Sequence, residues 1–384
     1  MRISRRTFVG GVAAWAGLTA GGCRCLPGRD GRTYSAAILG DLHYDRSPET
    51  FYHAKFISEF GGTGRHPGRF KELTRNAVMW QGPSRRILAA SGKCVTDDTA
   101  LVLQMGDLIQ GDCNDFGVHK KMLEDTLAFM RKVYPKNLPF LSVCGNHDIR
   151  HGNDRNDNAA IEPYEQFMIP YGRKAVGEWA CGTINDTTYG FRCGPDLYVM
   201  LNFNKGAQTM PVVRKILEEN TDVRYTFVVT HGGVYPFDCW NRRWFYLGKP
   251  KEDEERREMR SLLASRDAIV LCGHTHHLEL KDAKFPEGWL TELTMNTVQG
   301  LSTGGENPAA PEVIREGTNR YGDAEWVRKD PTVQALFDEY RPYMTRYYLA
   351  NAVGHGRLRV SDAGVWFDYY GRDAIRPTKT FLIR

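Results

Sequence analysis

The chain contains, at residues 138–148, the apolar run Leu138-Pro-Phe-Leu-Ser-Val-Cys144 followed directly by Gly145-Asn146-His147-Asp148. A short apolar run that ends in several polar residues is typical of a buried strand that carries side chains to the edge of a sheet. In α/β proteins, ligand sites form at the carboxyl edge of the sheet. The stretch therefore predicts a buried strand with a functional loop at its carboxyl end.

Four further segments repeat this arrangement along the chain, each after a short apolar or β-branched run at residues 33–39, 99–105, 225–230 or 267–272. They are Asp41-x-His43, Gly106-Asp107, Thr230-His231 and Gly273-His274-Thr275-His276. Together the five segments supply two Asp, one Asn and four His that can bind metal, with His147 left over. Imidazole and carboxylate ligands suit Mn, Fe and Zn, and no thiolate in the motifs favours a closed structural zinc site. This ligand set predicts a hydrolytic site in which two neighbouring cations share one carboxylate.

The five motifs, in this order, resemble those of the calcineurin-like metallophosphoesterase family. The resemblance implies a two-sheet α/β/α sandwich over about residues 34–298, with the end of the chain closing the second sheet. It implies the following metal ligands: Asp41, His43 and His276 for the first ion, Asn146, His231 and His274 for the second, and Asp107 as the bridge between them. The ions would be Mn or Fe, with Zn as a further option.

The resemblance also implies that His147 faces the substrate and does not bind metal. It would protonate the leaving oxygen or donate a hydrogen bond to a phosphate oxygen, because an alkoxide is a poor leaving group near neutral pH. Asp148 would orient His147. The catalytic residues predicted from the sequence are therefore His147 and Asp148.

We accordingly expect a dinuclear phosphoesterase that hydrolyses phosphomonoesters or phosphodiesters of small molecules by attack of metal-activated hydroxide. One alternative is a cyclic-nucleotide phosphodiesterase, since Asp-x-His in the first motif occurs in that branch of the family. A second alternative, from a different class, is a non-catalytic cell-surface binding protein that retains the fold.

The segments between the motifs read mainly as helices, and the middle and end of the chain as hairpins. Apolar spacing predicts helices at 69–90, 120–133, 212–220, 252–265 and 332–340, and hairpins at 189–202 and 356–370. We expect residues 1–32 to be a signal peptide and linker, and residues 33–384 to be one catalytic domain with insertions near 49–93 and 300–346. These insertions could shape substrate choice or could be a surface cover.

Several residues near the motifs allow two readings. Arg150 and His151 could bind phosphate or could be solvated loop residues, and His277 is expected to be exposed. The loop with Asp238, Trp240, Arg242 and Trp244 could stack a nucleobase, or its aromatic residues could pack a lid or the core. Cys144 and Cys272 are expected to be small buried residues, and Cys181 and Cys193 could pair across strands (the sequence holds nine cysteines in all).

The N-terminus carries a second signal. Ser4-Arg-Arg-Thr-Phe-Val9 resembles a twin-arginine export motif, and the apolar run that follows, residues 8–20, is shorter than the ~20 residues that a membrane-spanning helix needs. A signal anchor or a chance arginine pair is the alternative. Cys23 suggests lipidation, although Ala20 stands where a large aliphatic residue is usual. We therefore expect export to the periplasm, either as a soluble protein or as a membrane-anchored lipoprotein.

Export would also change the charge of the protein. Removing residues 1–22, which hold three arginines and no acidic residue, lowers the formal charge from +5 to +2. A chain that is nearly neutral gives no case for binding nucleic acid through counterion release. The sequence therefore favours a small-molecule substrate, and it leaves the oligomeric state open.

Overall fold

The computed structural model describes residues 31–45, 76, 78–80, 82–113, 115–151, 158–177, 180–185 (backbone only), 188–237, 253–299 and 309–384. The arginine pair of the N-terminal motif, Cys23, the glycine-rich part of the first insertion and the loop from Asp238 to Trp244 lie outside this range. Within it, no helix is long and apolar enough to cross a membrane.

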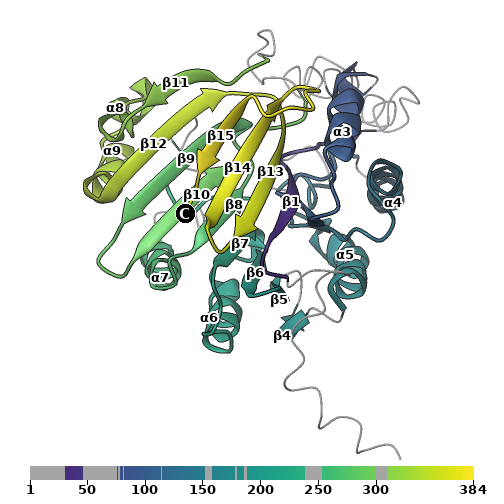
Figure 1. The fold of residues 1–384 in the computed structure, drawn as a ribbon, viewed down its shortest axis with the longest axis horizontal. Helices are drawn as coiled ribbons and strands as arrows, with labels where there is room; N and C mark the ends of the chain where they lie inside the picture. Colours follow the sequence, from purple (N-terminus) through teal and green to yellow (C-terminus); the bar gives the residue numbers. More distant parts are fainter. Residues whose placement is uncertain are drawn as a thin grey trace, which may run out of the picture.

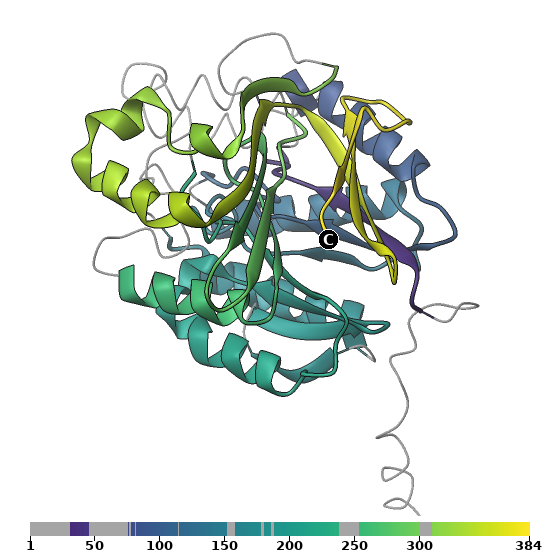
Figure 2. The same cartoon turned by 60° about the vertical axis from the view of Figure 1, so that its left-hand side comes forward.

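Two β-sheets lie face to face at the centre of the molecule (Figures 1 and 2). The six-stranded sheet has the order β15-β14-β13-β1-β2-β3, and the nine-stranded sheet has the order β11-β12-β9-β10-β8-β7-β6-β5-β4. The strands of the first sheet are β1 (Tyr34–Leu39), β2 (Thr99–Gln104), β3 (Phe140–Ser142), β13 (Gly354–Ser361), β14 (Gly364–Gly371) and β15 (Lys379–Leu382). Those of the second are β4 (Ala180–Asn185), β5 (Thr188–Cys193), β6 (Asp196–Leu201), β7 (Thr226–Thr230), β8 (Ile269–Cys272), β9 (His277–Lys284), β10 (Trp289–Thr294), β11 (Glu312–Glu316) and β12 (Met344–Asn351).

Parallel strands form the middle of each sheet. β1, β2 and β3 are mutually parallel, and so are β6, β7, β8 and β10. Helices cover the outer face of each sheet, namely α3 (Pro83–Lys93), α4 (Phe116–Val133) and α5 (Ile161–Val176) on one side and α6 (Met210–Glu218), α7 (Asp253–Ala264), α8 (Glu325–Lys329) and α9 (Pro331–Tyr340) on the other (Figures 1 and 2). Each sheet is thus covered by helices on one face and by the other sheet on the other, which allows its parallel strands to be apolar throughout.

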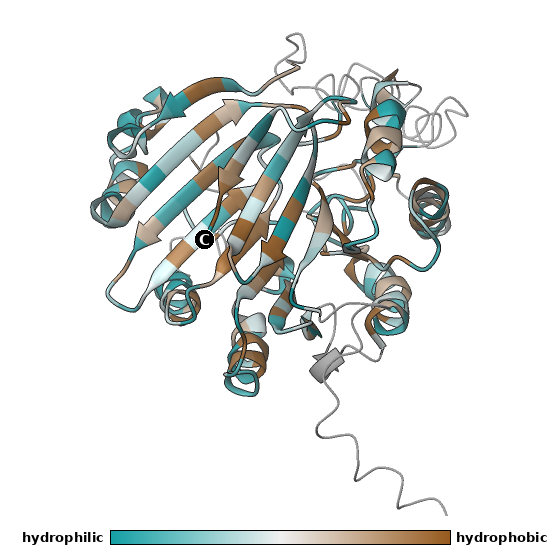
Figure 3. Ribbon diagram, viewed as in Figure 1, coloured by the Kyte–Doolittle hydropathy of each residue, from teal (hydrophilic) through white to brown (hydrophobic). Residues whose placement is uncertain are grey.

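Three hydrophobic cores follow from this layering. Along β1, Tyr34, Ala36 and Ile38 pack between the two sheets, whereas Ala37 and Leu39 pack against the helices. Strand β8 divides in the same way, with Ile269 and Leu271 between the sheets and Val270 and Cys272 facing helices. This is the alternation that a strand with two buried faces requires. Figure 3 shows the result, with apolar residues frequent along the strands and mixed hydropathy on the helices.

The fold class predicted from the sequence is confirmed: the molecule has two mixed sheets with helices outside each. The predicted helices at 120–133, 212–220, 252–265 and 332–340 and both hairpins are present, with shifted ends. The prediction of one continuous helix over 69–90 is wrong, because the helical residues 78–80 are separated from α3 by Gly82, whose backbone is not helical; residues 69–75 lie outside the described range. Proline suits the first turn of a helix but interrupts the one before it.

The position of the C-terminal hairpin also differs from the expectation. β13 pairs with β1, so the end of the chain extends the sheet of the first three motifs and does not close the second sheet. The segment before it, residues 309–346, packs on the nine-stranded sheet through α8 and α9. There the hydroxyl of Tyr321 donates to the carbonyl of Pro236, so this insertion contacts the end of the segment that follows His231.

A buried ionic cluster lies in the nine-stranded sheet. Lys281 on β9 is fully buried, with its Nζ 2.7 Å from Glu292 and 3.2 Å from Glu279, which are also buried. Burial opposes the charge of this lysine, but the two carboxylates outweigh it and raise the pKa of Lys281. Glu292 in turn accepts hydrogen bonds from the backbone N–H groups of Val234 and Tyr235, which follow His231. The cluster therefore holds the chain just beyond one of the predicted metal ligands.

Replacing this lysine tests the cluster. Lys281→Met leaves two buried carboxylates without their cation, and we expect a loss of about 3–5 kcal/mol in the free energy of unfolding, measured with urea. The control is Lys284→Met at the exposed end of the same strand, which should change stability by less than about 1 kcal/mol. Equal effects of the two substitutions would contradict a structural role for the buried cluster.

Candidate metal centre

The predicted ligands meet where the parallel strands of both sheets end. Asp41 and Asp107 follow β1 and β2, and Asn146 follows β3 in the same sheet. His231 follows β7, and His274 and His276 follow β8 in the facing sheet. Because the carboxyl ends of both parallel sets lie at one edge of the sandwich, residues more than 200 positions apart in sequence come into contact.

Among the described residues, two groups of side chains could each hold a cation. Asp41, His43, Asp107 and His276 form one group, and Asp107, His231 and His274 form the other; within each, the ligand atoms lie within 4.8 Å of one another. Asp107 belongs to both groups. Its Oδ2 lies 3.6 Å from Nε2 of His43 and 3.2 Å from Nε2 of His231. This is the position that a bridging carboxylate needs.

Asn146 joins the second group. Its Oδ1 lies 3.2 Å from Nε2 of His231, and the same Nε2 lies 2.7 Å from Nδ1 of His274. The other ring nitrogen of His231, Nδ1, donates to the carbonyl of Met105 over 2.7 Å. A backbone carbonyl on one nitrogen fixes the tautomer and leaves the other nitrogen facing the centre, as in many metal-binding histidines.

Motif glycines allow these groups to approach. A Cβ on Gly106 would lie 2.6 Å from Nδ1 of His231, and one on Gly273 would lie 2.8 Å from Oδ2 of Asp41. A Cβ on Gly145 would collide with the backbone and carboxylate of Asp107. The three glycines are therefore required by the close packing of the strand ends around the acidic residues.

The backbone is strained at the same place. Among the described non-glycine residues, His43, Asp107, His274 and His276 have positive φ angles of 44°, 52°, 77° and 59°. Asp112 does as well, at 57°. Such conformations cost of order 1–3 kcal/mol each and concentrate at functional sites. Asp267 and Arg372 also have positive φ angles, so the angle alone does not define the site. Asp112, which the sequence analysis did not select, is placed at the site by its carboxylate, 3.7 Å from Nδ1 of His147.

The chemistry of these donors fits metal cations. Nε2 of His43 and Nε2 of His276 lie 3.0 Å apart, so their lone pairs converge on one point. Burial opposes a charged ring at His231, but the carboxylates of Asp107 and Asp41 outweigh it and raise the pKa of His231 to about 9. Burial and the charge of His231 lower the pKa of His274 well below its usual value. The buried carboxylates favour positive charge at this site, but the histidine rings cannot all be protonated at once. A bound metal cation would supply the positive charge while its histidine ligands stay neutral.

His147 lies at the rim of the two groups. Its backbone N–H donates to Oδ1 of Asp107 over 2.8 Å, and its ring packs edge-on against His43, with 4.4 Å between the ring centroids. Nδ1 of His147 lies 2.8 Å from the carbonyl oxygen of Gln110, to which it donates. Nδ1 is therefore committed to the backbone, while Nε2 lies 3.0 Å from Nη1 of Arg150.

The expected role of Asp148 is not what the structure shows. Its carboxylate accepts hydrogen bonds from the backbone N–H groups of Ile109 and Gly145 and so joins the second and third motifs. Burial, followed by the Asp107 carboxylate, raises the pKa of Asp148 to about 7. The carboxylate near Nδ1 of His147 is that of Asp112, at 3.7 Å. The carbonyl of Gln110, at 2.8 Å from Nδ1, therefore orients the His147 ring, with Asp112 nearby, and the carboxylate of Asp148 is engaged by the backbone instead.

Other residues that position the centre carry no motif signal. Trp80 and Gln299 are both fully buried, and each donates to the backbone carbonyls of Leu42 and His43. They hold the first motif in its strained turn. A tryptophan and a glutamine outside any motif could not have been selected from the sequence, because only the fold places them against residues 42 and 43.

The structure also gives the burial and contacts of the other residues that the sequence analysis named near the motifs. His277 is buried, contrary to expectation, because it begins β9 and its Nδ1 bonds the carbonyl of Thr275. His151 packs against the ring of Phe116, with 4.1 Å between the centroids. Cys144 and Cys272 are buried free thiols, as expected. Cys193 is also a free thiol, and the strand register places Cys181 opposite Gly190, so the suggested disulfide is wrong.

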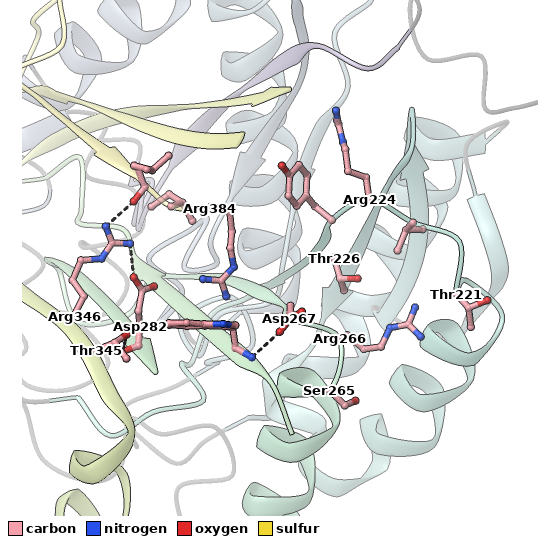
Figure 4. Close-up of a pocket in the computed structure, with 15 residues that line it drawn as sticks. Thr221, Arg224, Thr226, Ser265, Arg266, Asp267, Asp282, Thr345, Arg346 and Arg384 are labelled. Atoms are coloured by element: carbon pink, nitrogen blue, oxygen red, sulfur yellow. Dashed lines mark hydrogen bonds and ion pairs between the residues drawn. The ribbon is translucent and has the colours of Figure 1, made fainter. Parts of the chain in front are cut away.

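A cavity of about 910 Å³ lies away from this centre (Figure 4). It is lined by Thr226 at the start of β7, Asp267 just before β8 and Trp289 at the start of β10, together with several arginines. These are the amino ends of the strands whose carboxyl ends deliver His231 and His274. The cavity therefore lies at the opposite edge of the sheet and is not part of the metal centre.

The family described as calcineurin-like phosphoesterase matches residues 34–278. The chain belongs to this family. No curated protein matches it. The chain is similar to the solved structure of PhoD, with a TM-score of 0.50 and 9% identity, covering 93% of this chain and 70% of that chain. It is also similar to GAP50, the anchor in the inner membrane complex of Plasmodium, with a TM-score of 0.46 and 11% identity, covering 92% of this chain and 89% of that chain. A dimetal phosphatase from Danio rerio is similar with a TM-score of 0.47 and 11% identity, covering 92% of this chain and 99% of that chain. The PhoD likeness shows a shared fold and nothing more.

Membership in the phosphoesterase family makes the shared carboxylate the residue to test. Asp107→Asn should lower the occupancy of both metal positions, because one carboxylate balances the charge of two cations. His43→Ala should empty mainly one. Metal content per chain after gel filtration is the measurement, and Asp222→Asn, at an exposed carboxylate, is the control. If Asp107→Asn and His43→Ala lose the same amount of metal, the bridging assignment is wrong.

Proposed function

We propose that this protein is a dinuclear phosphoesterase that hydrolyses phosphomonoesters or phosphodiesters of small molecules. The observation that carries the proposal is the pair of ligand groups that share Asp107, with His147 beside them and not within either group. A non-catalytic binding protein would not need a proton donor beside its metal ligands. Family membership supports the same class of reaction.

Each part of the site has a role in this proposal. Asp41, His43 and His276 would hold one ion, Asn146, His231 and His274 the other, and Asp107 both. When bound at these residues, two such cations (Mn or Fe, with Zn as a further option) would bind a phosphoryl group and supply hydroxide chemistry at neutral pH. His147 donates a proton from Nε2 to the leaving oxygen, while Nδ1 stays bonded to Gln110.

A substrate screen tests the proposal. The purified protein, loaded in turn with Mn, Fe and Zn, is assayed against nitrophenyl monoesters, nitrophenyl diesters and cyclic nucleotides. Metal-dependent hydrolysis of any of these supports the proposal, and preference for cyclic nucleotides selects the phosphodiesterase alternative. Tight metal binding without hydrolysis of any ester would favour the binding-protein alternative.

His147 gives the sharpest single test of mechanism. His147→Ala should keep both metals, since His147 is in neither ligand group, yet lose about 10²–10⁴-fold in rate, the usual contribution of general acid catalysis. The loss should be smaller for esters with acidic leaving groups such as nitrophenol, which need less protonation. Depletion of metal in this variant would contradict the assignment.

We also propose that the protein is exported by the twin-arginine route and works in the periplasm, either free or anchored by a lipid on Cys23. Arg5 and Arg6, ahead of a short and mildly apolar segment, support this. That route carries folded proteins, which suits an enzyme that acquires its metals before it leaves the cytoplasm.

Replacing Arg5 and Arg6 with lysine tests the route. The paired variant should accumulate active, metal-loaded protein in the cytoplasm, because the family match begins at residue 34, beyond the proposed signal. Cell fractionation followed by the phosphoesterase assay measures this. Unchanged export would point to a general secretory signal, which tolerates lysine. Cys23→Ala is a separate variant, and its release from the membrane fraction would show anchoring by lipid.

A further inference from the structure

Arg150 is a buried cation beside the metal centre that the proposed function leaves without a role. Only 5% of the residue is exposed, which excludes the reading of a solvated loop residue. Its only close carboxylate among the described residues is that of Asp112, at 3.5 Å from Nη1, and its Nε has no hydrogen-bond partner there. Buried guanidinium groups are normally paired by two well-aligned hydrogen bonds to a carboxylate. The described residues therefore satisfy the guanidinium of Arg150 only in part.

The guanidinium of Arg150 lies over the ring of His147. Nη1 is 3.0 Å from Nε2 and 3.4 Å from Nδ1 of that ring. A donor in line with the lone pair of one ring nitrogen would be far from the other nitrogen, because the two lone pairs point to different sides of the ring. Similar distances to both place Nη1 above the ring face. The guanidinium of Arg150 therefore lies against the face of the His147 ring, the residue that the proposed function places at the leaving oxygen.

Asp112 holds this arrangement in place. Its carboxylate contacts Nη1 of Arg150 and accepts a hydrogen bond from Nε2 of Gln110, and its backbone N–H donates to the carbonyl of Arg150 over 3.1 Å. The positive φ of Asp112 is maintained despite its cost. Asp112 therefore holds Arg150 in two ways: its carboxylate contacts the guanidinium, and its backbone N–H donates to the carbonyl of Arg150.

Arg150 places a buried positive charge beside the metal centre. Its one close carboxylate among the described residues, that of Asp112, lies 3.5 Å from Nη1. A phosphoryl oxygen next to Arg150 would offset this charge and accept hydrogen bonds from the guanidinium, whose planar donors suit phosphate.

We propose that Arg150 binds an oxygen of the substrate's phosphoryl group and that Asp112 is the positioning residue that keeps its guanidinium over His147. The inference rests on the proposed function and adds to it a specific phosphate contact. It makes Arg150 a residue of substrate binding and Asp112 one that acts only through Arg150 and His147.

The test uses the metal-loaded full chain and inorganic phosphate as the probe. Arg150→Met should raise the dissociation constant for phosphate, measured by calorimetry, and the KM for the best ester of the screen by about 10–100-fold, the worth of hydrogen bonds to a charged group. Metal content should stay unchanged, since Arg150 is in neither ligand group. Arg214→Met, at an exposed arginine of α6, is the matched control and should change neither quantity.

Asp112→Asn separates positioning from direct binding. It should weaken phosphate binding by a smaller factor than Arg150→Met, and it should have little further effect when combined with Arg150→Met, because it acts through the same guanidinium. Arg150→Lys keeps the charge but not the planar donors, so it should lie between the wild type and Arg150→Met. It serves as the deciding variant if Arg150→Met does not fold.

The outcomes distinguish the inference from the proposed function. Wild-type protein that carries metal but neither hydrolyses esters nor binds phosphate would refute both. If wild-type protein is active and both Arg150 variants bind phosphate within twofold of it, the phosphate contact alone is overturned. Loss of metal from Arg150→Lys would likewise overturn it, because Arg150 would then support the metal ligands and not the substrate.

Discussion

The side chains of Asp41 and Asp107 are buried carboxylates, and the surrounding structure must balance their negative charge. Each is almost fully excluded from water, where an ionised carboxylate is costly unless positive charge lies beside it. The fold meets this requirement by bringing four imidazole rings from two sheets against the two acids. Glycines at the strand ends, strained turns at the ligands and the hydrogen bonds of Trp80 and Gln299 all serve that close approach. The metal centre thus joins the ends of strands from both sheets.

The same requirement explains why the surroundings of the centre are so polar. Asp148 links the second and third motifs through backbone N–H groups, and Gln104 bonds the carbonyls of Gly40 and Gly106. The Lys281 cluster holds the chain after His231. A loop that carries metal ligands has no regular ladder of hydrogen bonds, so buried side chains must satisfy its backbone. These contacts keep the ligands in place before any ion binds, which is what a site of fixed geometry needs.

Arg150 and Asp112 lie next to His147. If Arg150 and His147 contact the phosphoryl group as proposed, both side chains are in place before the substrate binds, which lowers the cost of reorganisation. Gly111 and Asp112, which follow the second motif, pack against the residues of the third motif and those just after it. The insertion with α8 and α9 contacts Pro236 and is thereby connected to the loop beyond His231.

The sequence by itself determined the strands, their polar ends and the set of metal-binding residue types. Apolar runs followed by Asp, Asn or His are local patterns, and strand alternation and motif order can be read without coordinates. Tertiary structure decided what depends on contacts between distant segments: that β13 joins β1, that Asp112 and not Asp148 lies by Nδ1 of His147, and that Arg150 and His277 are buried. The contacts of Trp80 and Gln299 with the first motif likewise depend on tertiary structure. In each case the residue type is common, and only the packing of one segment on another gives its side chain a partner and therefore a role.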